Sequence, residues 1–280
     1  MLLHQKKELC AAACRIRLGI IEATHAASSG HPGGSLSCAD ALTWLYFRQM
    51  NVDPNKPDDM ARDRFVLSKG HAAPALYATL AERGYFPVEE LKTLRRYGSR
   101  LQGHPSMKSL PGVDMSTGSL GQGISAAVGM ALAAKLSGTS QRIYALLGDG
   151  EMQEGQVWEA LMSAAHYKLD NLCVLVDRNT LQIDGRTADV MNPEPIAEKL
   201  QAFGLAVKTV NGHDFDELEQ AFAWAQTVSS EPAAIVLNTI KGKGVSFMQD
   251  LAAWHGQAPN DEQYAAACAE LKQQLQELEG

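Results

Sequence analysis

The sequence predicts an α/β fold, in which one doubly wound, mainly parallel sheet carries helices on both faces. In the second half of the chain, short apolar runs alternate with stretches of helical periodicity, the pattern that produces a parallel sheet. Runs such as "IYALL" and "LCVLV" are apolar at every position, which is typical of strands covered on both faces. With 280 residues and 45% hydrophobic content, the chain can bury a sizeable core, and we expect one domain over residues 1–280.

Each element is predicted from its apolar periodicity and from the turn residues that bound it. The expected strands, in chain order, cover residues 64–68, 143–147, 172–176, 205–210 and 233–239. The expected helices cover residues 6–28, 36–50, 73–83, a short stretch opened by Pro87, 121–136, 156–167, 195–203, 215–228 and a C-terminal helix from Asp261. A glycine-containing loop from Gly98 to Gly118 is longer than most connections, and such loops in compact domains are usually functional or disordered.

The charge and composition exclude several classes of protein. The net charge of −7 comes without a basic run or stripe, which argues against binding to nucleic acid. The most apolar window, Ile124–Ala134, is too short to span a bilayer, and the N-terminus lacks the cleavage site of a signal peptide. No CxxC pair occurs, and Cys10 and Cys14, on one helix face, are expected to be core thiols. We therefore expect a soluble, cytoplasmic protein that binds no membrane.

Polar side chains follow two strands of the predicted sheet at the points where those strands end. Asp149, flanked by Gly148 and Gly150, follows one strand, and Asn179 follows the next. Ligands of such sheets bind at the carboxyl ends of the strands, so the two side-chain oxygens can converge on one Mg²⁺ or Ca²⁺ ion if the strands are neighbours. The glycines allow a ligand to approach the backbone closely. A GDG run alone is more often a tight turn, but together with the amide and the βαβ unit it predicts a magnesium–diphosphate site.

This arrangement resembles the signature of thiamine-diphosphate enzymes, and five segments are similar to transketolase in their residues and in their order along the chain. They are "SSGHPGGSLS" (28–37), "SKGHAAPALYA" (68–78), "GHPS" (103–106), "TGSLGQGIS" (117–125) and "GDGEMQEGQVWEA" (148–160). Because these segments span most of the chain, the sequence is identified as the diphosphate-binding domain of a member of the transketolase family.

The resemblance implies a role for each matching residue. The magnesium ligands would be the side chains of Asp149 and Asn179 and the backbone carbonyl of Leu181. The residues expected to contact the cofactor are His71, Gly118, Leu120, Gly148, Asp149, Gly150, Asn179, Ile183 and His255. Glu154 matches a glutamate that couples to an activating glutamate of the partner, although an acid in the first turn of a helix more often serves as a dipole partner or a solvated cap.

Four loop histidines, each next to a glycine in the chain, carry the proton chemistry that the resemblance implies. His31 and His104 match residues that bind hydroxyl and carbonyl oxygens of the donor sugar, while His71 and His255 match residues nearer the diphosphate. A lone loop histidine is usually incidental, but imidazole titrates near neutrality and can donate, accept or shuttle protons. The remaining histidines have no match at the site and are expected to be incidental: His4, His25, His166 and His213.

The resemblance covers only the first of the three transketolase domains. The pyrimidine-binding domain, with its activating glutamate, and the small C-terminal domain have no counterpart in these residues. The resemblance therefore implies a split transketolase, in which this chain forms the N-terminal subunit. It would pair with a C-terminal subunit in an α2β2 assembly; a truncated sequence is the alternative. The reaction implied is the transfer of a two-carbon ketol unit from a ketose phosphate to an aldose phosphate, with thiamine diphosphate as the cofactor.

Three alternatives remain open. Deoxyxylulose-phosphate synthase and the α subunit of 2-oxo-acid dehydrogenases share the GDG…N metal site, and the second of these is also a split protein. The segments "HPGG" and "GDGEMQEGQVWEA" favour transketolase over both. A non-catalytic cofactor-binding module is the third alternative, and the intact metal ligands together with the four histidines argue against it.

Overall fold

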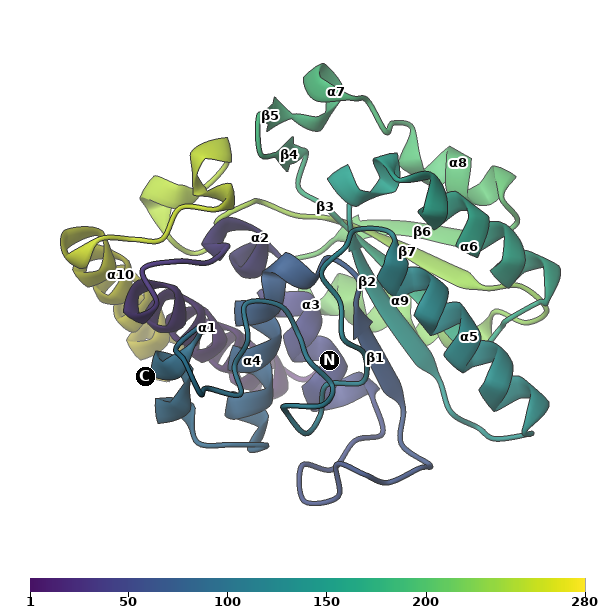
Figure 1. Ribbon diagram of the computed structural model, residues 1–280, viewed down its shortest axis with the longest axis horizontal. Coiled ribbons are helices and arrows are strands. Elements are labelled where there is room, and N and C mark those ends of the chain that lie inside the picture. Colours follow the sequence, from purple (N-terminus) through teal and green to yellow (C-terminus); the bar gives the residue numbers. More distant parts are fainter. Residues whose placement is uncertain (280) are drawn as a thin grey trace.

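The structure is a computed structural model that describes residues 1–279. Its centre is a five-stranded sheet in which every neighbouring pair of strands is parallel (Figure 1). In sheet order, the strands are β1 (Arg64–Leu67), β2 (Ile143–Gly148), β3 (Leu172–Arg178), β7 (Ala233–Asn238) and β6 (Ala206–Asn211). The predicted doubly wound, mainly parallel α/β fold is confirmed.

Helices cover both faces of this sheet and complete two apolar cores (Figure 1). The side chains of β2 alternate between them, because Tyr144 and Leu146 belong to one core, whereas Ala145 and Leu147 belong to the other. The first core is covered by α1 (Leu3–Ala26), α2 (Pro32–Ser37), α3 (Ala39–Trp44), α4 (Ala73–Arg83), α9 (Phe215–Thr227) and α10 (Asp261–Glu279). The second core is covered by α5 (Gln122–Leu136), α6 (Gly155–His166) and α8 (Ile196–Ala202).

The structure differs from the expected elements in three places. The stretch 36–50 is not one helix, since it contains the end of α2, then α3, and then a π-helical turn at Leu45–Gln49. Strand β3 continues beyond its apolar run to Arg178, because its last two residues still pair with β7. The segment after β3 contains a hairpin of β4 (Leu181–Gln182) and β5 (Gly185–Arg186). Strands of two residues carry too little periodicity to be predicted from a sequence.

Short helical turns complete the chain. They are α7 (Thr187–Val190) and the 3₁₀ turns Gly70–Ala72, Val88–Thr93, Gly150–Gln153, Ser246–Met248 and Ala252–His255. Pro87 immediately precedes one of these turns, and the loop 98–118 contains neither helix nor strand, both as predicted. Across residues 1–279, we find no helix with the length and apolar character needed to cross a membrane.

The parallel strands place the loops that follow them at one edge of the sheet. The register pairs Gly148, at the end of β2, with Asp177 in β3, and it pairs Arg178 with Asn238 at the end of β7. Strands β2 and β3 are therefore neighbours, as a shared metal site for Asp149 and Asn179 requires.

Candidate active site

A cavity of about 310 Å³ lies at this edge of the sheet, and the loops after β1, β2, β3 and β7 all contribute to its lining. The sequence-predicted residues that line it are His31, His71, Gly118, Leu120, Gly148, Asp149, Gly150, Glu154, Asn179, Leu181, Ile183 and His255. His104 is the one predicted residue outside this lining. Its ring lies beside Gly118, with Cγ 3.4 Å from where a Cβ of residue 118 would stand.

Asp149 and Asn179 are both buried, each at the end of its strand. The carboxylate of Asp149 accepts the backbone N–H groups of Gly150 at 2.9 Å and of Thr180 at 2.5 Å. The side-chain oxygen of Asn179 accepts the N–H of Leu181 at 3.2 Å. Thr180 has a φ of +64°, a left-handed conformation that is costly for a β-branched residue. The surrounding contacts thus hold a strained turn that brings both side-chain oxygens to the cavity.

The electrostatic environment of Asp149 suits a bound cation. Burial, followed by the nearby carboxylate of Asp177, raises the pKa of Asp149 to about 6. A divalent cation would offset this loss of hydration and favour the ionised form. No cluster of three or more His, Cys, Asp or Glu side chains within residues 1–279 could hold a metal by itself. A metal at Asp149 therefore needs amide and backbone oxygens as its other ligands, and these are the donors that Mg²⁺ and Ca²⁺ accept.

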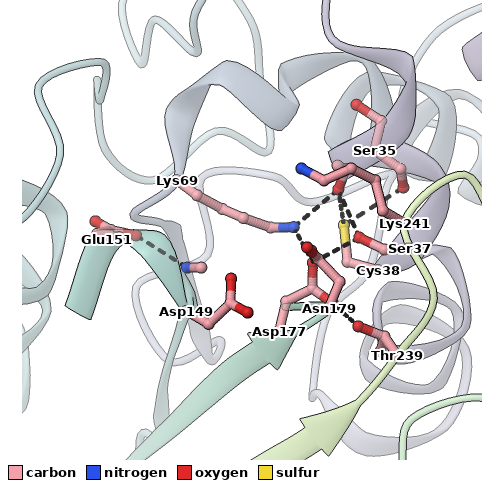
Figure 2. A network of polar contacts seen from close by, with 12 residues as sticks. Ser35, Ser37, Cys38, Lys69, Asp149, Glu151, Asp177, Asn179, Thr239 and Lys241 are labelled. Carbon is pink, nitrogen blue, oxygen red and sulfur yellow. Dashed lines mark hydrogen bonds and ion pairs between the residues drawn. The ribbon is translucent and has the colours of Figure 1, made fainter. Parts of the chain in front are cut away.

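A buried ion pair lies next to Asp149 and Asn179 and links several loops (Figure 2). Lys69 Nζ lies 2.6 Å from Asp177 Oδ2, and both side chains are at most 2% exposed. Asp177 also accepts hydrogen bonds from Ser37, from Thr239 and from the side-chain nitrogen of Asn179. Although burial opposes the charged form of Lys69, Asp177 raises the pKa of Lys69, so the pair is ionised. Because the nitrogen of the Asn179 amide is engaged by Asp177, the ligand-binding atom is the amide oxygen, which accepts only the N–H of Leu181 within the described chain and keeps a second lone pair.

Lys241 is a second buried lysine, and it supplies the cavity with a cation. The residue is 2% exposed and lines the cavity, and its Nζ lies 3.1 Å from Nδ1 of His255. Unlike Lys69, it makes no ion pair with a carboxylate of the described chain. Burial, followed by the charge of Lys69, lowers the pKa of Lys241 to about 8. An anionic group in the cavity would favour the charged ammonium, so Lys241 is suited to hold one.

Three of the four predicted histidines form a cluster beside Lys241. The ring centroids of His31 and His71 are 5.2 Å apart, those of His71 and His255 are 5.2 Å apart, and those of His31 and His255 are 5.6 Å apart. Burial lowers the pKa of His31 to about 4, that of His255 to about 3 and that of His71 well below its usual value. All three rings are therefore neutral at pH 7, with one donor and one acceptor nitrogen each. The buried Nδ1 of His31 has no partner within residues 1–279, which leaves it for a ligand.

Glu151 connects three of the segments around the cavity. Its carboxylate accepts the hydroxyl of Ser68 at 2.5 Å and the backbone N–H groups of Gly121 at 2.9 Å and Gly148 at 3.1 Å. The side chain is buried, and this burial raises its pKa. The predicted residue Glu154 lies three positions further on and is exposed at the cavity, where it is accessible to a partner chain.

Sequence reasoning missed four charged residues of this site: Lys69, Glu151, Asp177 and Lys241. Lys69 and Glu151 stand inside "SKGHA" and "GDGE", where the histidine and the aspartate are the more conspicuous residues. Asp177 had a usable signal, because it follows directly on the apolar run "LCVLV". A charge at the end of a buried strand requires a partner, and its partner is a further candidate for the site.

A cavity at the carboxyl ends of parallel strands is the place where open α/β sheets bind small ligands, so the fold and the site define a ligand-binding α/β domain. The model of the transketolase family described as "Transketolase, thiamine diphosphate binding domain" matches residues 8–276. The chain belongs to this family, which confirms the resemblance seen in the sequence.

Relatives of similar length and solved transketolases of greater length both match the chain. It is 49% identical to the 6-deoxy-6-sulfo-D-fructose transketolase subunit SqwG of a Clostridium species, over 88% of this chain and 89% of that protein. It is 43% identical to one of the subunits of the apulose-4-phosphate transketolase of Phocaeicola vulgatus, over 94% of this chain and 93% of that protein. The crystal structure of Campylobacter jejuni transketolase superposes with a TM-score of 0.87 at 33% identity, over 97% of this chain and 43% of that one. The chain thus spans less than half the length of the solved transketolases.

Proposed function

We propose that this chain is the N-terminal subunit of a two-chain transketolase, and that it consists of a single diphosphate-binding domain over residues 1–280. It binds thiamine diphosphate with Mg²⁺ or Ca²⁺ and helps to transfer a two-carbon ketol unit from a ketose phosphate to an aldose phosphate. The observation that carries the proposal is the common cavity, lined by oxygen ligands for a hard cation, by a buried lysine and by three neutral histidines.

The cavity residues fit the metal and the diphosphate in their chemistry. Asp149, the side-chain oxygen of Asn179 and the backbone carbonyl of Leu181 would hold the cation. The ammonium of Lys241 would hold the diphosphate, together with the N–H of Gly150, which would exchange the carboxylate of Asp149 for a diphosphate oxygen. Thiamine diphosphate, when bound, supplies the electron sink for cleaving and forming the carbon–carbon bond. The protein contributes orientation, charge balance and proton transfer.

The histidines would manage protons at the donor sugar. His31 has a buried nitrogen that no group of residues 1–279 contacts by a hydrogen bond, and we assign this histidine with His104 to the hydroxyl and carbonyl oxygens of the donor. His71 and His255, whose ring centroids are 5.2 Å apart, would contact the cofactor and exchange protons with the reacting oxygen. Neutral rings suit this role, because each can accept a proton at one nitrogen while it donates at the other.

We also propose a partner chain. Two of the relatives are named as transketolase subunits of similar length, and the chain spans only 38% of human transketolase. The partner would carry the pyrimidine-binding domain in an α2β2 assembly, and Glu154 would reach its activating glutamate. The assembly would be cytoplasmic. By itself, this chain would bind the cofactor without turning over a substrate.

The test is to purify the tagged chain from its own cells and to identify what co-elutes. The eluate is assayed with thiamine diphosphate, Mg²⁺, an aldose phosphate acceptor and a ketose donor. Because the relatives are named for a sulfonated and a phosphorylated sugar, the donors include both kinds. We expect a second chain and two-carbon transfer. A decarboxylation of pyruvate would instead support one of the other thiamine-diphosphate enzymes, and an inactive single chain would support a binding module.

The metal assignment has its own test. We expect Asp149→Ala and Asn179→Ala to abolish Mg²⁺-dependent binding of thiamine diphosphate, measured by titration calorimetry, because each removes an oxygen ligand. Asp189→Ala, in the exposed α7, is the matched control and should bind as the unaltered chain does. Tight binding by either cavity variant would overturn the assignment.

A further inference from the structure

We propose that His213 is a positioning residue for the cofactor site: it connects a buried ion pair of the N-terminal helices to the backbone next to Lys241 and so holds that lysine in the cavity. This histidine has no counterpart in the motifs discussed above and was expected to be incidental. The inference rests on the proposed function only for the identity of the ligand that Lys241 meets.

His213 lies between two buried elements. Its Nδ1 is 2.7 Å from Oδ2 of Asp40, and their side chains are 10% and 7% exposed. Asp40 is in turn held by both terminal nitrogens of Arg17, at 3.0 Å and 2.6 Å. On the other side of the ring, the backbone N–H of Ile240 donates to Nε2 at 2.9 Å. The ring therefore joins α1 and α3 to the loop after β7.

The two contacts of His213 define its tautomer. Nε2 faces the N–H of Ile240, which can only donate, so Nε2 carries no proton. Nδ1 must then carry the proton and donate it to the carboxylate of Asp40. Asp40 is ionised: burial opposes the charged form, but the charge of Arg17 and the hydrogen bonds from His213 and Arg17 together outweigh it and lower the pKa of Asp40 to about 2. A neutral ring in this tautomer satisfies both neighbours at once.

The loop that His213 holds is the one that carries Lys241. Ile240 directly precedes Lys241, and the backbone N–H of Gly242 donates to the carbonyl of Gly33 at 3.0 Å. Arg17 adds a further bond, since its Nε donates to the carbonyl of Lys243 at 3.0 Å. These bonds secure the backbone on both sides of Lys241, whose ammonium has only the ring of His255 as a partner within the described chain. The position of that ammonium therefore depends on the backbone around it.

The loop can be tested without any cofactor. In His213→Asn, the shorter amide can still donate to Asp40 but does not reach Ile240, whereas in His213→Gln the side-chain oxygen can replace Nε2 as the acceptor. We expect hydrogen exchange of residues 240–244 in the chain without cofactor to become roughly tenfold faster in His213→Asn, the effect of losing one buried hydrogen bond. His213→Gln should recover part of the protection. His166→Asn, on the exposed side of α6, should leave it unchanged.

Two further measurements report on Lys241 itself. Its rate of labelling by an amine-reactive reagent, relative to that of the exposed Lys108, should rise in His213→Asn and return toward the original value in His213→Gln. The affinity for thiamine diphosphate with Mg²⁺, measured by calorimetry, should fall roughly tenfold in the first variant and less in the second.

The outcomes separate this inference from the proposed function. Unchanged exchange of residues 240–244 and unchanged labelling of Lys241 in a folded His213→Asn chain would overturn the positioning role. The same applies if His213→Gln behaves no better than His213→Asn, since a general loss of packing would affect both alike. Failure of the unaltered chain to bind thiamine diphosphate would refute the proposed function, while the exchange and labelling results would still decide the role of His213.

Discussion

The ion pair of Lys69 and Asp177 is the feature whose removal we expect to cost the most stability. Both side chains are almost fully buried, and their charged atoms lie 2.6 Å apart. Removing one partner leaves the other charge buried without compensation, which typically costs about 3–5 kcal/mol. We therefore expect Lys69→Met and Asp177→Asn each to lower the free energy of unfolding by about this amount. Because the whole free energy of unfolding of a domain is about 5–15 kcal/mol, either decrease is large.

The double variant Lys69→Met/Asp177→Asn makes the prediction specific. With neither charge left, the desolvation cost disappears. The free energy of unfolding of the double variant should therefore fall by roughly 2 kcal/mol less than the sum of the decreases in the two single variants. Urea unfolding followed by circular dichroism gives the three values, with an unchanged dependence on urea as the check that all variants unfold in the same way. Strictly additive losses, or single losses below about 1 kcal/mol, would refute the idea of a tightly coupled buried pair.

Three further predictions concern the cavity and the residues packed around it. Gly33→Ala should lower the melting temperature by several degrees, because its Cβ would stand only 2.7 Å from the carbonyl oxygen of Trp254; an unchanged melting temperature would count against this close packing. NMR titration of His31 and His255 should show no transition near pH 6.5 but midpoints near 4 and 3. Their folded pKa values lie below the unfolded value, so their support of the fold is fully present above pH 6.5, is lost progressively as the pH falls below 6.5, and is gone once the pH has fallen through about 4 and 3. Midpoints near 6.5 would contradict the prediction that burial lowers the pKa of these two histidines. Glu151→Gln should cost about 1–3 kcal/mol in urea unfolding, since an amide cannot accept all three donors that the carboxylate satisfies; a neutral effect would show that the segments it joins hold together without it.

The linear pattern of residues was enough to predict the fold and the strand ends at which the candidate site lies. Continuously apolar runs such as the one that precedes Asp149 are local patterns, and burial of those runs on both faces leaves a parallel sheet as the solution. Asp149 and Asn179 could be predicted to lie close together, because consecutive strands of such sheets are usually neighbours. The register of β2 and β3 confirms that these two strands are neighbours. The four histidines could also be predicted, because each stands in a short contiguous motif of the family.

Which charges meet is settled only by the packing of the whole domain. Lys69 and Asp177 are 108 positions apart in the chain, and His213 contacts Asp40 across 173 positions. No periodicity or spacing encodes such pairs, because they depend on which loops and helices the packed sheet brings together. The same holds for the hairpin after β3, whose two-residue strands have no pattern of their own. A buried charge must be satisfied wherever the chain places a partner, and that placement exists only once the domain has folded.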